Sequence, residues 1–401
     1  MKKLLLLGGA RPQIPLINTA HKMGYYVITC DYLPDNPGHK LADESYNVST
    51  TDLDGVLNLA RNLKIDGIVC FASDPAAPTA AYISEKMGLP TSPYNSVNIL
   101  THKDLFRDFL AKNGFKTPLA IGFSEHEYSQ AVQNVKKFSY PFLIKPVDSS
   151  GSKGITIVRR EEDIKTAVSY ALSFSRCKRF LFEEYIEKKG YQVAGDGFSV
   201  AGNLSFYCFA NDHFHEDIDG NYIPVGESFP YVGGKGNESK VFGEIQRALK
   251  LLNMKTQAYN FEARINRDGA VYLMEIGPRS GGNAIPQATA YATGTNMIEY
   301  VIKAAMGEDC HDIKMAAPKG YWGTYMLHSN SSGTFRRIEM KDGFDDVNLV
   351  EMDLNLQPGE RVEEFTGANK AIGTMICKFS SEEEMLSKMD NMEKWVKPIV
   401  D

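Results

Sequence analysis

The stretch Asn260-Phe-Glu-Ala-Arg-Ile-Asn-Arg-Asp-Gly-Ala-Val-Tyr-Leu-Met-Glu-Ile-Gly277 predicts a β-hairpin that decides how the rest of the chain is interpreted. Asp268-Gly269 is the strongest short-range hairpin signal, and a two-residue turn there places Glu262 directly opposite Glu275. Like charges in that arrangement destabilise a sheet, so the pair needs a shared proton or a cation. Oxygen ligands of this kind suit Mg²⁺ that is held together with substrate phosphates.

Period-two alternation predicts which face of this hairpin is buried. The apolar face, which we expect to pack into a core, consists of Phe261, Ala263, Ile265, Tyr272, Met274 and Ile276. The polar face carries Asn260, Glu262, Arg264 and Glu275. Two alternatives remain open: a solvated face with salt bridges through Arg264, or a register slip that sends one glutamate to the other face.

Composition is ordinary for a soluble globular protein, with 43% apolar and 23% charged residues over 401 positions. The net charge of −6, without a long basic run, argues against nucleic acid as a partner. The six cysteines form no C-x-x-C pair, which favours buried free thiols in a reducing cytosol. The apolar run Leu4–Leu7 is too short for a signal peptide or a membrane span. We therefore expect a cytoplasmic protein without a membrane partner.

Strands and helices alternate over the first hundred residues, which predicts a parallel α/β sheet. Expected strands cover 4–7, 26–31 and 67–72, and expected helices cover 14–23, 53–63 and 76–87. Gly8-Gly9 lacks the G-x-G-x-x-G pattern, so a dinucleotide oxidoreductase is a distant alternative. Because ligands favour the carboxyl ends of such strands, weak candidates for a substrate pocket are Gly8, Gly9, Arg11, Ser73 and Asp74.

Farther along, a serine- and glycine-rich loop, Asp148-Ser-Ser-Gly-Ser-Lys-Gly154, lies between two expected strands. Its backbone N–H groups have little side-chain obstruction, and concave runs of amides bind anions. It is not a P-loop, because a strand and not a helix follows. Lys145 on the preceding strand is a compact charge suited to a phosphate oxygen. A plain hairpin loop with a surface lysine is the alternative.

The remaining sequence predicts helices mixed with antiparallel strands. One helix over 96–112 carries Lys103, and a second over 161–172 leads to the strand 180–186. Further strands are expected over 190–210 and 222–232, helices over 238–252 and 287–306, and a strand-rich tail with a last helix near 381–395.

In their order along the chain, these motifs resemble the ATP-grasp family of carboxylate–amine (or thiol) ligases. The resemblance covers residues 96–310 and includes Lys103, Ile144-Lys145-Pro146, the serine- and glycine-rich loop, Phe182-Glu-Glu-Tyr-Ile186, Glu262 and Met274-Glu-Ile-Gly-Pro-Arg-Ser-Gly-Gly282. It implies an α/β and α+β protein with a two-lobed ATP-grasp fold. The implied domains are a pre-ATP-grasp parallel α/β domain (1–95), a small lobe with a linker helix (96–186), a large lobe with the metal site (187–315) and a β-rich C-terminal module (316–401).

The resemblance also assigns roles to residues, with ATP and Mg²⁺ as cofactors and Mn²⁺ as a substitute metal. Lys103 and Lys145 would contact phosphates, and Arg279 would stabilise the transferred phosphoryl group. Glu262 and Glu275 would hold the metal. The loop that closes over the phosphates would consist of Ser149, Ser150, Gly151, Ser152 and Gly154, and the adenine pocket would be lined by Glu183, Glu184 and Ile186.

Two departures from the family pattern stand out. Gln192 replaces a glutamate that usually binds the ribose, so it would hydrogen-bond without charge. Gly277 replaces the asparagine of a Glu-x-Asn-Pro-Arg metal strand. Because the expected hairpin places Asn260 opposite Gly277, we hypothesise that Asn260 returns the lost amide oxygen to the metal. A water ligand, or the absence of the second metal, is the alternative.

The segment Asp212-His-Phe-His-Glu-Asp-Ile-Asp-Gly220 looks metal-binding but fails as a calcium loop, since glycine stands at the twelfth place. His213 and His215 could bind zinc, but no further cysteine or histidine stands at suitable spacing. We expect a mobile loop near an acceptor pocket, or a solvated turn. Glu227 would suit an amine in that pocket, or form a salt bridge at its rim.

Together these features predict an ATP-dependent ligase that activates a carboxylate as an acyl phosphate for attack by an amine, with release of ADP and phosphate. Its expected partners are a small-molecule carboxylate and an amine. One alternative is carboxylation or carbamoylation of an amine with bicarbonate on the same fold. Another is an ATP-binding protein with impaired catalysis, suggested by Gly277 and Gln192. The sequence leaves both substrates and the oligomeric state open, although a homodimer is the commonest arrangement.

Overall fold

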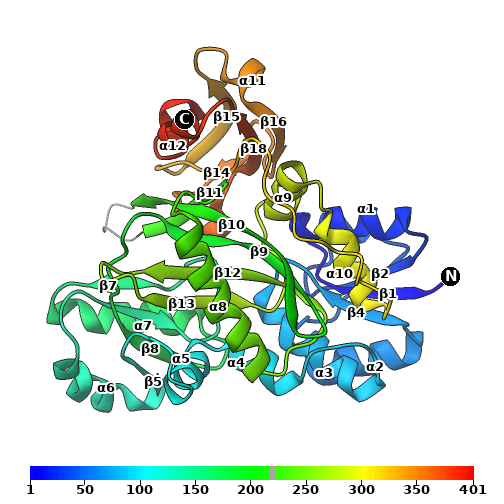
Figure 1. Ribbon diagram of the computed structural model, residues 1–401, viewed down its shortest axis with the longest axis horizontal. Coiled ribbons are helices and arrows are strands. Elements are labelled where there is room, and N and C mark those ends of the chain that lie inside the picture. The colour runs from blue at the N-terminus through cyan, green and yellow to red at the C-terminus, as the bar shows by residue number, and fades with distance from the viewer. Residues whose placement is uncertain (217–221) are drawn as a thin grey trace.

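The N-terminal sheet of the computed structural model, which describes residues 1–216 and 222–401, is parallel with the order β3-β2-β1-β4 (Figure 1). Leu4 and Leu6 of its central strand pack on one face, against α1 and α10, while Leu5 and Leu7 pack on the other, against α2 and α3. Burial on both faces explains the continuous apolar run. The strands are β1 (Lys3–Leu7), β2 (Tyr26–Cys30), β3 (Glu44–Tyr46) and β4 (Gly67–Cys70), and the first helices are α1 (Ile14–Lys22), α2 (Leu53–Leu63) and α3 (Ala77–Met87).

The expected helix over 96–112 is two helices, α4 (Tyr94–Thr101) and α5 (Lys103–Lys112). His102 separates them because its backbone is extended, with φ −117° and ψ 112°. Lys103 therefore begins α5, and its backbone N–H donates to the carbonyl of Val147 at 2.8 Å. The break brings this lysine to the serine- and glycine-rich loop.

A second sheet forms the small lobe, with antiparallel strands in the order β5-β8-β6-β7. Its core is aromatic and includes Phe123, Phe142, Phe180 and Phe182. Strand β5 and helix α6 have no counterpart in the sequence-based expectation. The elements are β5 (Ala120–Ser124), α6 (Tyr128–Asn134), β6 (Phe142–Pro146), β7 (Thr156–Val158), α7 (Ile164–Phe174) and β8 (Arg179–Glu184).

The largest sheet is antiparallel and has the order β13-β12-β9-β10-β11-β14-β18-β16. Helix α8 (Lys235–Leu251) packs on one face, and α9 (Ile285–Thr293) and α10 (Met297–Ala305) pack on the other. The latter two were expected as one helix, but Gly294 ends α9 with φ +79°. The strands are β9 (Gln192–Val200), β10 (Asn203–Glu216), β11 (Tyr222–Phe229), β12 (Gln257–Ile265), β13 (Val271–Gly277), β14 (Tyr321–Leu327), β16 (Leu349–Leu354) and β18 (Gly373–Phe379).

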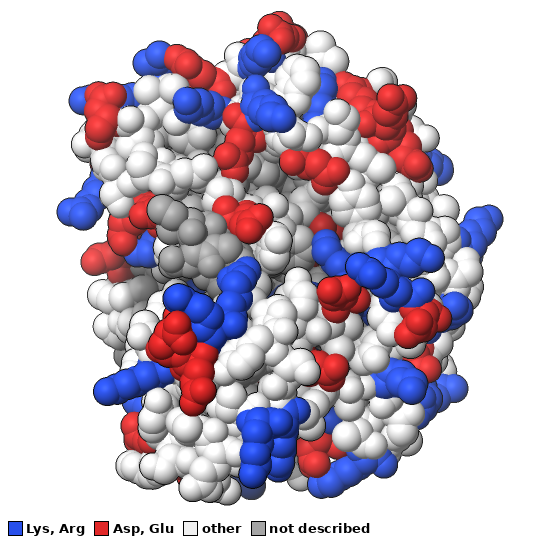
Figure 2. All heavy atoms as spheres, turned by 90° about the vertical axis from the view of Figure 1, so that its left-hand side faces the viewer, with Lys and Arg blue, Asp and Glu red and all other residues white. Residues whose placement is uncertain are grey.

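The chain after residue 316 extends this sheet and also forms a smaller one, β17-β15-β19. The last helix is shorter than expected. The elements of this part are β15 (Gly333–Met340), α11 (Phe344–Val347), β17 (Arg361–Val362), α12 (Glu382–Met389) and β19 (Val396–Val400). No helix among the described residues has both the length and the hydrophobicity that a bilayer crossing needs. Acidic and basic side chains are interspersed over the face shown in Figure 2.

The hairpin of β12 and β13 has the expected pairs, Glu262 with Glu275 and Asn260 with Gly277, but its turn and its register near the turn differ from the prediction. Its loop has three residues, since Asn266 N–H donates to the Ala270 carbonyl at 3.0 Å and Gly269 is left-handed with φ +78°. A bulge after Glu262 then corrects the register.

This route changes the buried face of the hairpin. Val271 and Leu273, not Tyr272 and Met274 as expected, pack in the core with Phe261. Met274 lines a cavity instead. The reason is that the three-residue loop shifts the alternation of β13 by one residue, and the bulge shifts it back before Glu275.

Candidate active site

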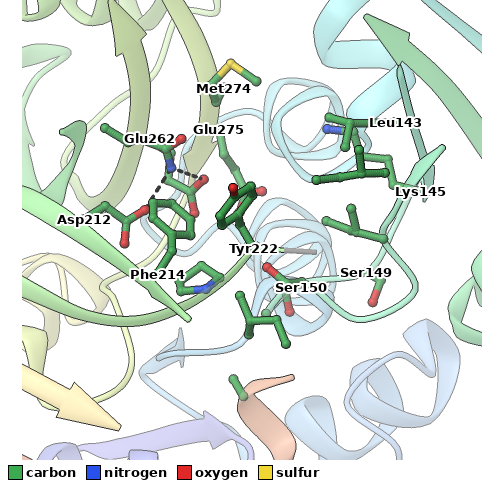
Figure 3. A pocket seen from close by; sticks show the side chains of 18 of the residues that line it. Leu143, Lys145, Ser149, Ser150, Asp212, Phe214, Tyr222, Glu262, Met274 and Glu275 are labelled. Atoms are coloured by element: carbon green, nitrogen blue, oxygen red, sulfur yellow. Dashed lines mark hydrogen bonds between the residues drawn. The ribbon is translucent and has the colours of Figure 1, made fainter. Parts of the chain in front are cut away.

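A cavity of about 920 Å³ lies between the small lobe and the large sheet. The sheet places acidic side chains on one side of it, and Lys145 and the serine-rich loop lie on the other (Figure 3). Of the residues expected from the sequence, those that line it are Lys103, Lys145, Ser149, Ser150, Gly151, Ser152, Gln192, Asn260, Glu262, Glu275 and Arg279. Gly154, Glu183, Glu184 and Ile186 are not among its lining residues, and neither are Gly8, Gly9, Arg11 and Ser73.

The Glu262–Glu275 pair is linked to a lysine. Lys103 Nζ lies 3.2 Å from Glu275 Oε2 and donates to the Ser149 carbonyl at 2.8 Å. Burial of Glu262 and the charge of Glu275 raise the pKa of Glu262 to about 7. Burial opposes the charge of Lys103, but Glu275 and Asp74 outweigh it and raise the pKa of this lysine. The two glutamates thus form a site that favours an added cation.

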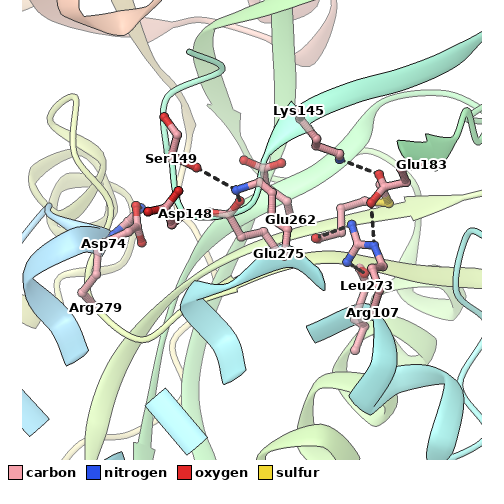
Figure 4. Close-up of polar contacts among 12 residues, drawn as sticks. Asp74, Arg107, Lys145, Asp148, Ser149, Glu183, Glu262, Leu273, Glu275 and Arg279 are labelled. Atoms are coloured by element: carbon pink, nitrogen blue, oxygen red, sulfur yellow. Dashed lines mark hydrogen bonds and ion pairs between the residues drawn. The ribbon is translucent and has the colours of Figure 1, made fainter. Parts of the chain in front are cut away.

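Lys145 is held by Glu183, which is not among the residues that line the cavity. Figure 4 shows the contact between the two side chains. Lys145 Nζ is 2.5 Å from Glu183 Oε1, and Arg107 Nε is 2.8 Å from Glu183 Oε2. Arg107 also donates to the carbonyls of Leu273 and Met274, at 3.3 and 2.9 Å. The Glu183 side chain is fully buried and is the counterion that positions Lys145. The expected role of Glu183 at an adenine pocket stays a prediction.

Burial still lowers the pKa of Lys145 to about 8, despite the attraction of Glu183. For Glu183, the two cations outweigh burial and lower its pKa to about 2. Sequence reasoning missed Arg107. Its one signal is an arginine on the apolar face of α5, next to the buried Phe106 and Leu110.

The last residue of β8 and the segment after it include the other two residues expected at the adenine pocket. Glu184 is exposed and accepts a hydrogen bond from the Leu119 N–H at 3.0 Å. The Ile186 carbonyl accepts one from Arg264 Nη1 at 3.0 Å. Tyr185, between them, lines the cavity. The roles of Glu184 and Ile186 toward a nucleotide stay predictions.

Gln192 connects two acidic groups in the cavity. Its Nε2 donates to Asp212 Oδ2 at 2.9 Å and to Glu262 Oε2 at 3.2 Å, and its Oε1 accepts from Arg264 Nε at 2.6 Å. A glutamine suits this position because a carboxylate could not donate to either acid. Its binding to a ribose stays a prediction.

A second carboxylate pair, Asp212 and Glu227, is directly opposed across β10 and β11. Both side chains are buried and line the cavity. Glu227 Oε2 has no hydrogen-bond partner among the described residues. Burial, and then Glu262, raises the pKa of Asp212 well above its usual range; burial, and then Asp212, does the same for Glu227.

This pair corrects the interpretation of 212–220 as a loop, since Asp212 to Glu216 belong to β10. Residues 217–220 of that segment lie outside the described residues. Glu227 is not part of a rim salt bridge within the described chain. The missed signal is the strand-like alternation of 211–216, which the charged residues obscured.

Arg279 is oriented by the N-terminal domain. Its Nη2 lies 2.5 Å from Asp74 Oδ2, and its Nε has no partner in the described structure. Arg279 outweighs burial and lowers the pKa of Asp74. A Cβ atom at Gly277 would lie 3.0 Å from Asp74 Oδ1 and 3.3 Å from Arg279 Cζ. Glycine at this position therefore makes room for the ion pair.

Asn260 lines the same cavity opposite Gly277, as the register predicted. Its Nδ2 donates to Asp196 Oδ1 at 2.9 Å and to the Gly195 carbonyl at 3.3 Å. Burial raises the pKa of Asp196 to about 6. Because Asp196 takes the N–H groups of the amide, the geometry suits the Asn260 oxygen as an acceptor or ligand; that role stays a prediction.

Comparison with known proteins agrees with this geometry. Residues 138–287 match the ATP-grasp domain. A formate-dependent phosphoribosylglycinamide formyltransferase from Francisella tularensis subsp. tularensis (strain SCHU S4 / Schu 4) is 25% identical over 335 residues, 79% of this chain and 80% of the relative. The chain contains an ATP-grasp domain, and its relatives support an ATP-grasp carboxylate–amine ligase. ATP-grasp ligases of this kind are ADP-forming enzymes that make C–N bonds.

Solved structures share the whole fold of this ATP-grasp ligase. The L-amino acid ligase from Bacillus licheniformis has a TM-score of 0.81 at 19% identity, covering 100% of this chain and 99% of that one. The biotin carboxylase domain of Hydrogenobacter thermophilus 2-oxoglutarate carboxylase, in complex with MgADP, ADP and bicarbonate, has a TM-score of 0.74 at 17% identity, covering 100% and 90%. The likeness to these structures thus extends beyond residues 138–287 to the N-terminal parallel sheet and the strand-rich C-terminal part.

Proposed function

We propose that this ATP-grasp ligase transfers the γ-phosphoryl group of ATP to a carboxylate and that an amine then displaces phosphate, forming an amide bond. One observation carries the proposal: the paired carboxylates Glu262 and Glu275 share a cavity with Lys103, Lys145 and Arg279. Phosphoryl transfer requires positioning and charge neutralisation more than covalent chemistry. This set of cations and metal-ligating oxygens meets that requirement.

The donor set fits Mg²⁺ bound together with a nucleotide. Glu262 and Glu275 offer carboxylate oxygens from directly paired positions, and Asn260 would add an amide oxygen from the same strand as Glu262. Mg²⁺ prefers oxygen ligands, and it is commonly held by one or two carboxylates plus phosphates. When bound, the ion would neutralise charge on the β- and γ-phosphates.

The cations of the site would bind different parts of the anionic ligands, namely the phosphates of ATP and the transferred phosphoryl group. Lys145, held in place by Glu183, and Lys103 at the start of α5 would bind phosphate oxygens. The loop of Ser149, Ser150 and Ser152 would cover the phosphates with backbone N–H groups. Arg279, fixed by Asp74 and with its Nε unpaired in the described structure, would contact the transferred phosphoryl group and the acyl phosphate.

The amine would bind on the opposite side of the cavity from Lys145. Asp212 and Glu227 offer buried negative charge there, and Glu227 has an oxygen without a partner among the described residues. A protonated amine would satisfy this oxygen. Glu227 could then accept its proton, because its raised pKa makes it a stronger base than an exposed carboxylate. The bicarbonate alternative uses the same ATP site but would not need a carboxylic acid substrate.

A phosphate-release screen with MgATP tests this function. The acids would be amino acids, dipeptides and bicarbonate, each with and without an amine acceptor, and Glu275→Ala would be the blank. We expect release that depends on both a carboxylic acid and an amine, while Glu244→Ala, a change of a half-exposed carboxylate on α8 outside the cavity, retains it. Release that needs only bicarbonate and an amine would support carboxylation instead. ATP binding without turnover over the whole panel would contradict a ligase and favour an impaired ATP-binding protein.

A further inference from the structure

Two histidines and a glutamate meet outside the ATP cavity, where the C-terminal part packs on the large sheet. His215 belongs to β10, His328 follows β14, and Glu393 lies in a short 3-10 helix at Met392–Lys394. One ligand atom from each lies within 4.8 Å of the other two. The residues are far apart in the sequence, so no local spacing could predict the cluster.

A hydrogen bond to the backbone shows that Nδ1 of the His328 ring carries a proton. Its Nδ1 lies 2.8 Å from the carbonyl oxygen of Met326, which can only accept, so Nδ1 carries a proton. A neutral His328 then directs the lone pair of Nε2 at Glu393 Oε1, 3.2 Å away. Two lone pairs at this distance require a cation between them, either a second ring proton or a metal ion.

Packing holds the ring of His328 in the orientation that points its Nε2 at Glu393. The His328 side chain is 1% exposed and stacks on Phe365 with ring centroids 4.4 Å apart. His215 Nδ1 points to the same carboxylate oxygen from 2.9 Å. One divalent ion would bind all three donor atoms.

The outer contacts are those of a metal centre. A metal-ligating histidine commonly donates its other N–H to a backbone carbonyl, as His328 does to Met326. Asn330 Nδ2 lies 3.3 Å from Glu393 Oε2 and orients the carboxylate. Bonds of about 2.0–2.1 Å in a tetrahedral site place donors about 3.3 Å apart. The distances from Glu393 Oε1, 2.9 and 3.2 Å, are close to that value.

We propose that His215, His328 and Glu393 bind one Zn²⁺ ion with a fourth position open to water. Two imidazoles and one carboxylate form a donor set that zinc uses. The ion would fasten the 3-10 helix of Glu393 to β10, beside Phe214 and Tyr222 of the ATP cavity. The site thus links the C-terminal part to the sheet that carries the acidic pairs. It does not depend on the proposed ligase reaction.

Calorimetric titration of the chelator-treated, full-length protein with ZnCl₂ tests the proposal. Excess MgCl₂ would occupy the oxygen-ligand site at Glu262 and Glu275. We expect one equivalent of zinc to bind, with affinity lower by at least about tenfold in His328→Ala and in Glu393→Gln, and lower by about tenfold in Asn330→Ala. His311→Ala, which removes an exposed histidine paired with Asp309, is the matched control and should bind zinc as the wild type does.

A folding measurement separates lost ligands from lost structure. Glu393→Gln keeps the volume of a half-exposed side chain, so its zinc-free melting temperature should be close to that of the wild type. Zinc should raise the melting temperature of the wild type and not of this variant. Absence of a zinc equivalent in the wild type would overturn the site in favour of an imidazolium–carboxylate contact. Equal zinc affinity in wild type and His328→Ala would overturn it as well.

Discussion

The two acidic pairs of the large sheet differ in the cations that the protein provides for them. Glu275 of the β12–β13 pair has Lys103 Nζ at 3.2 Å. The β10–β11 pair, Asp212 and Glu227, has no salt bridge within the described chain, and one Glu227 oxygen lacks a partner there. Since like charges opposite each other destabilise a sheet, both pairs mark places for a charge supplied from outside. One suits a metal ion and the other an ammonium group.

A separate, fully buried carboxylate, Glu183, differs from both pairs because the protein itself provides its cations. Arg107 and Lys145 satisfy both of its oxygens, and they outweigh burial and lower its pKa to about 2. For Glu262, burial and Glu275 raise the pKa to about 7. A buried acid with internal partners therefore supports structure, and one without them is available to a ligand.

The largest effect should come from Glu275→Ala, which removes one half of the metal pair. We expect phosphate release to fall by about 10²–10³-fold or more, because charge neutralisation on the transferred group is lost. Asp212→Asn should leave metal-dependent ATP binding within about threefold of the wild type, since near the metal pair it alters only the hydrogen bond from Gln192. Steady-state release against Mg²⁺ and ATP concentration measures both. Equal losses of metal-dependent ATP binding in Glu275→Ala and Asp212→Asn would contradict the different roles assigned to the two pairs.

Glu183→Gln should destabilise the fold by about 3–5 kcal/mol, because it leaves Arg107 and Lys145 buried without a counterion. Urea unfolding monitored by tryptophan fluorescence measures this free energy. The exposed pair of Asp108 and Lys112 provides the control, where Asp108→Asn should change stability by no more than about 1 kcal/mol. A loss as small in Glu183→Gln as in the control would show that this acid is not a structural counterion.

Glu227→Gln should have the opposite sign and stabilise the free protein by about 1–3 kcal/mol at pH 8. Burial raises the pKa of Glu227 in the folded state, so its contribution to stability is complete below the unfolded-state pKa and is lost as the pH rises through the folded-state value. The gain should therefore be smaller at pH 5 than at pH 8. Thermal unfolding at both pH values measures it. The same variant should raise the KM for the amine while leaving that for ATP unchanged; destabilisation at pH 8 would refute the assignment.

The smallest effect concerns the hypothesis that Asn260 replaces the residue lost at Gly277. Asn260→Ala should raise the Mg²⁺ concentration for half-maximal activity by about tenfold, in line with the loss of one supporting group. Titration of activity with MgCl₂ at saturating ATP measures it. A Mg²⁺ dependence equal to that of the wild type would assign Asn260 to holding Asp196 alone.

Much of the fold could be predicted from local sequence patterns. The apolar run Leu4–Leu7 and the hairpin signal at Asp268-Gly269 each depend on only a few neighbouring residues. The register of Glu262 and Glu275 was correct although the turn was not, since a bulge compensated for the longer loop. Asp74 was already a weak candidate from its place after an expected strand, whereas Arg107 reaches Glu183 through a tertiary contact that no short-range pattern encodes. The same holds for Glu183, whose partners lie on α5 and β6.

The most direct measurement is a crystal structure of the enzyme with Mn²⁺ and a non-hydrolysable ATP analogue, with anomalous scattering used to locate the metal. We expect the anomalous peak between the carboxylates of Glu262 and Glu275, within bonding distance of phosphate oxygens, and none at Asp212 and Glu227. A peak between Asp212 and Glu227 alone, or triphosphate density far from Lys145, would contradict the central claim.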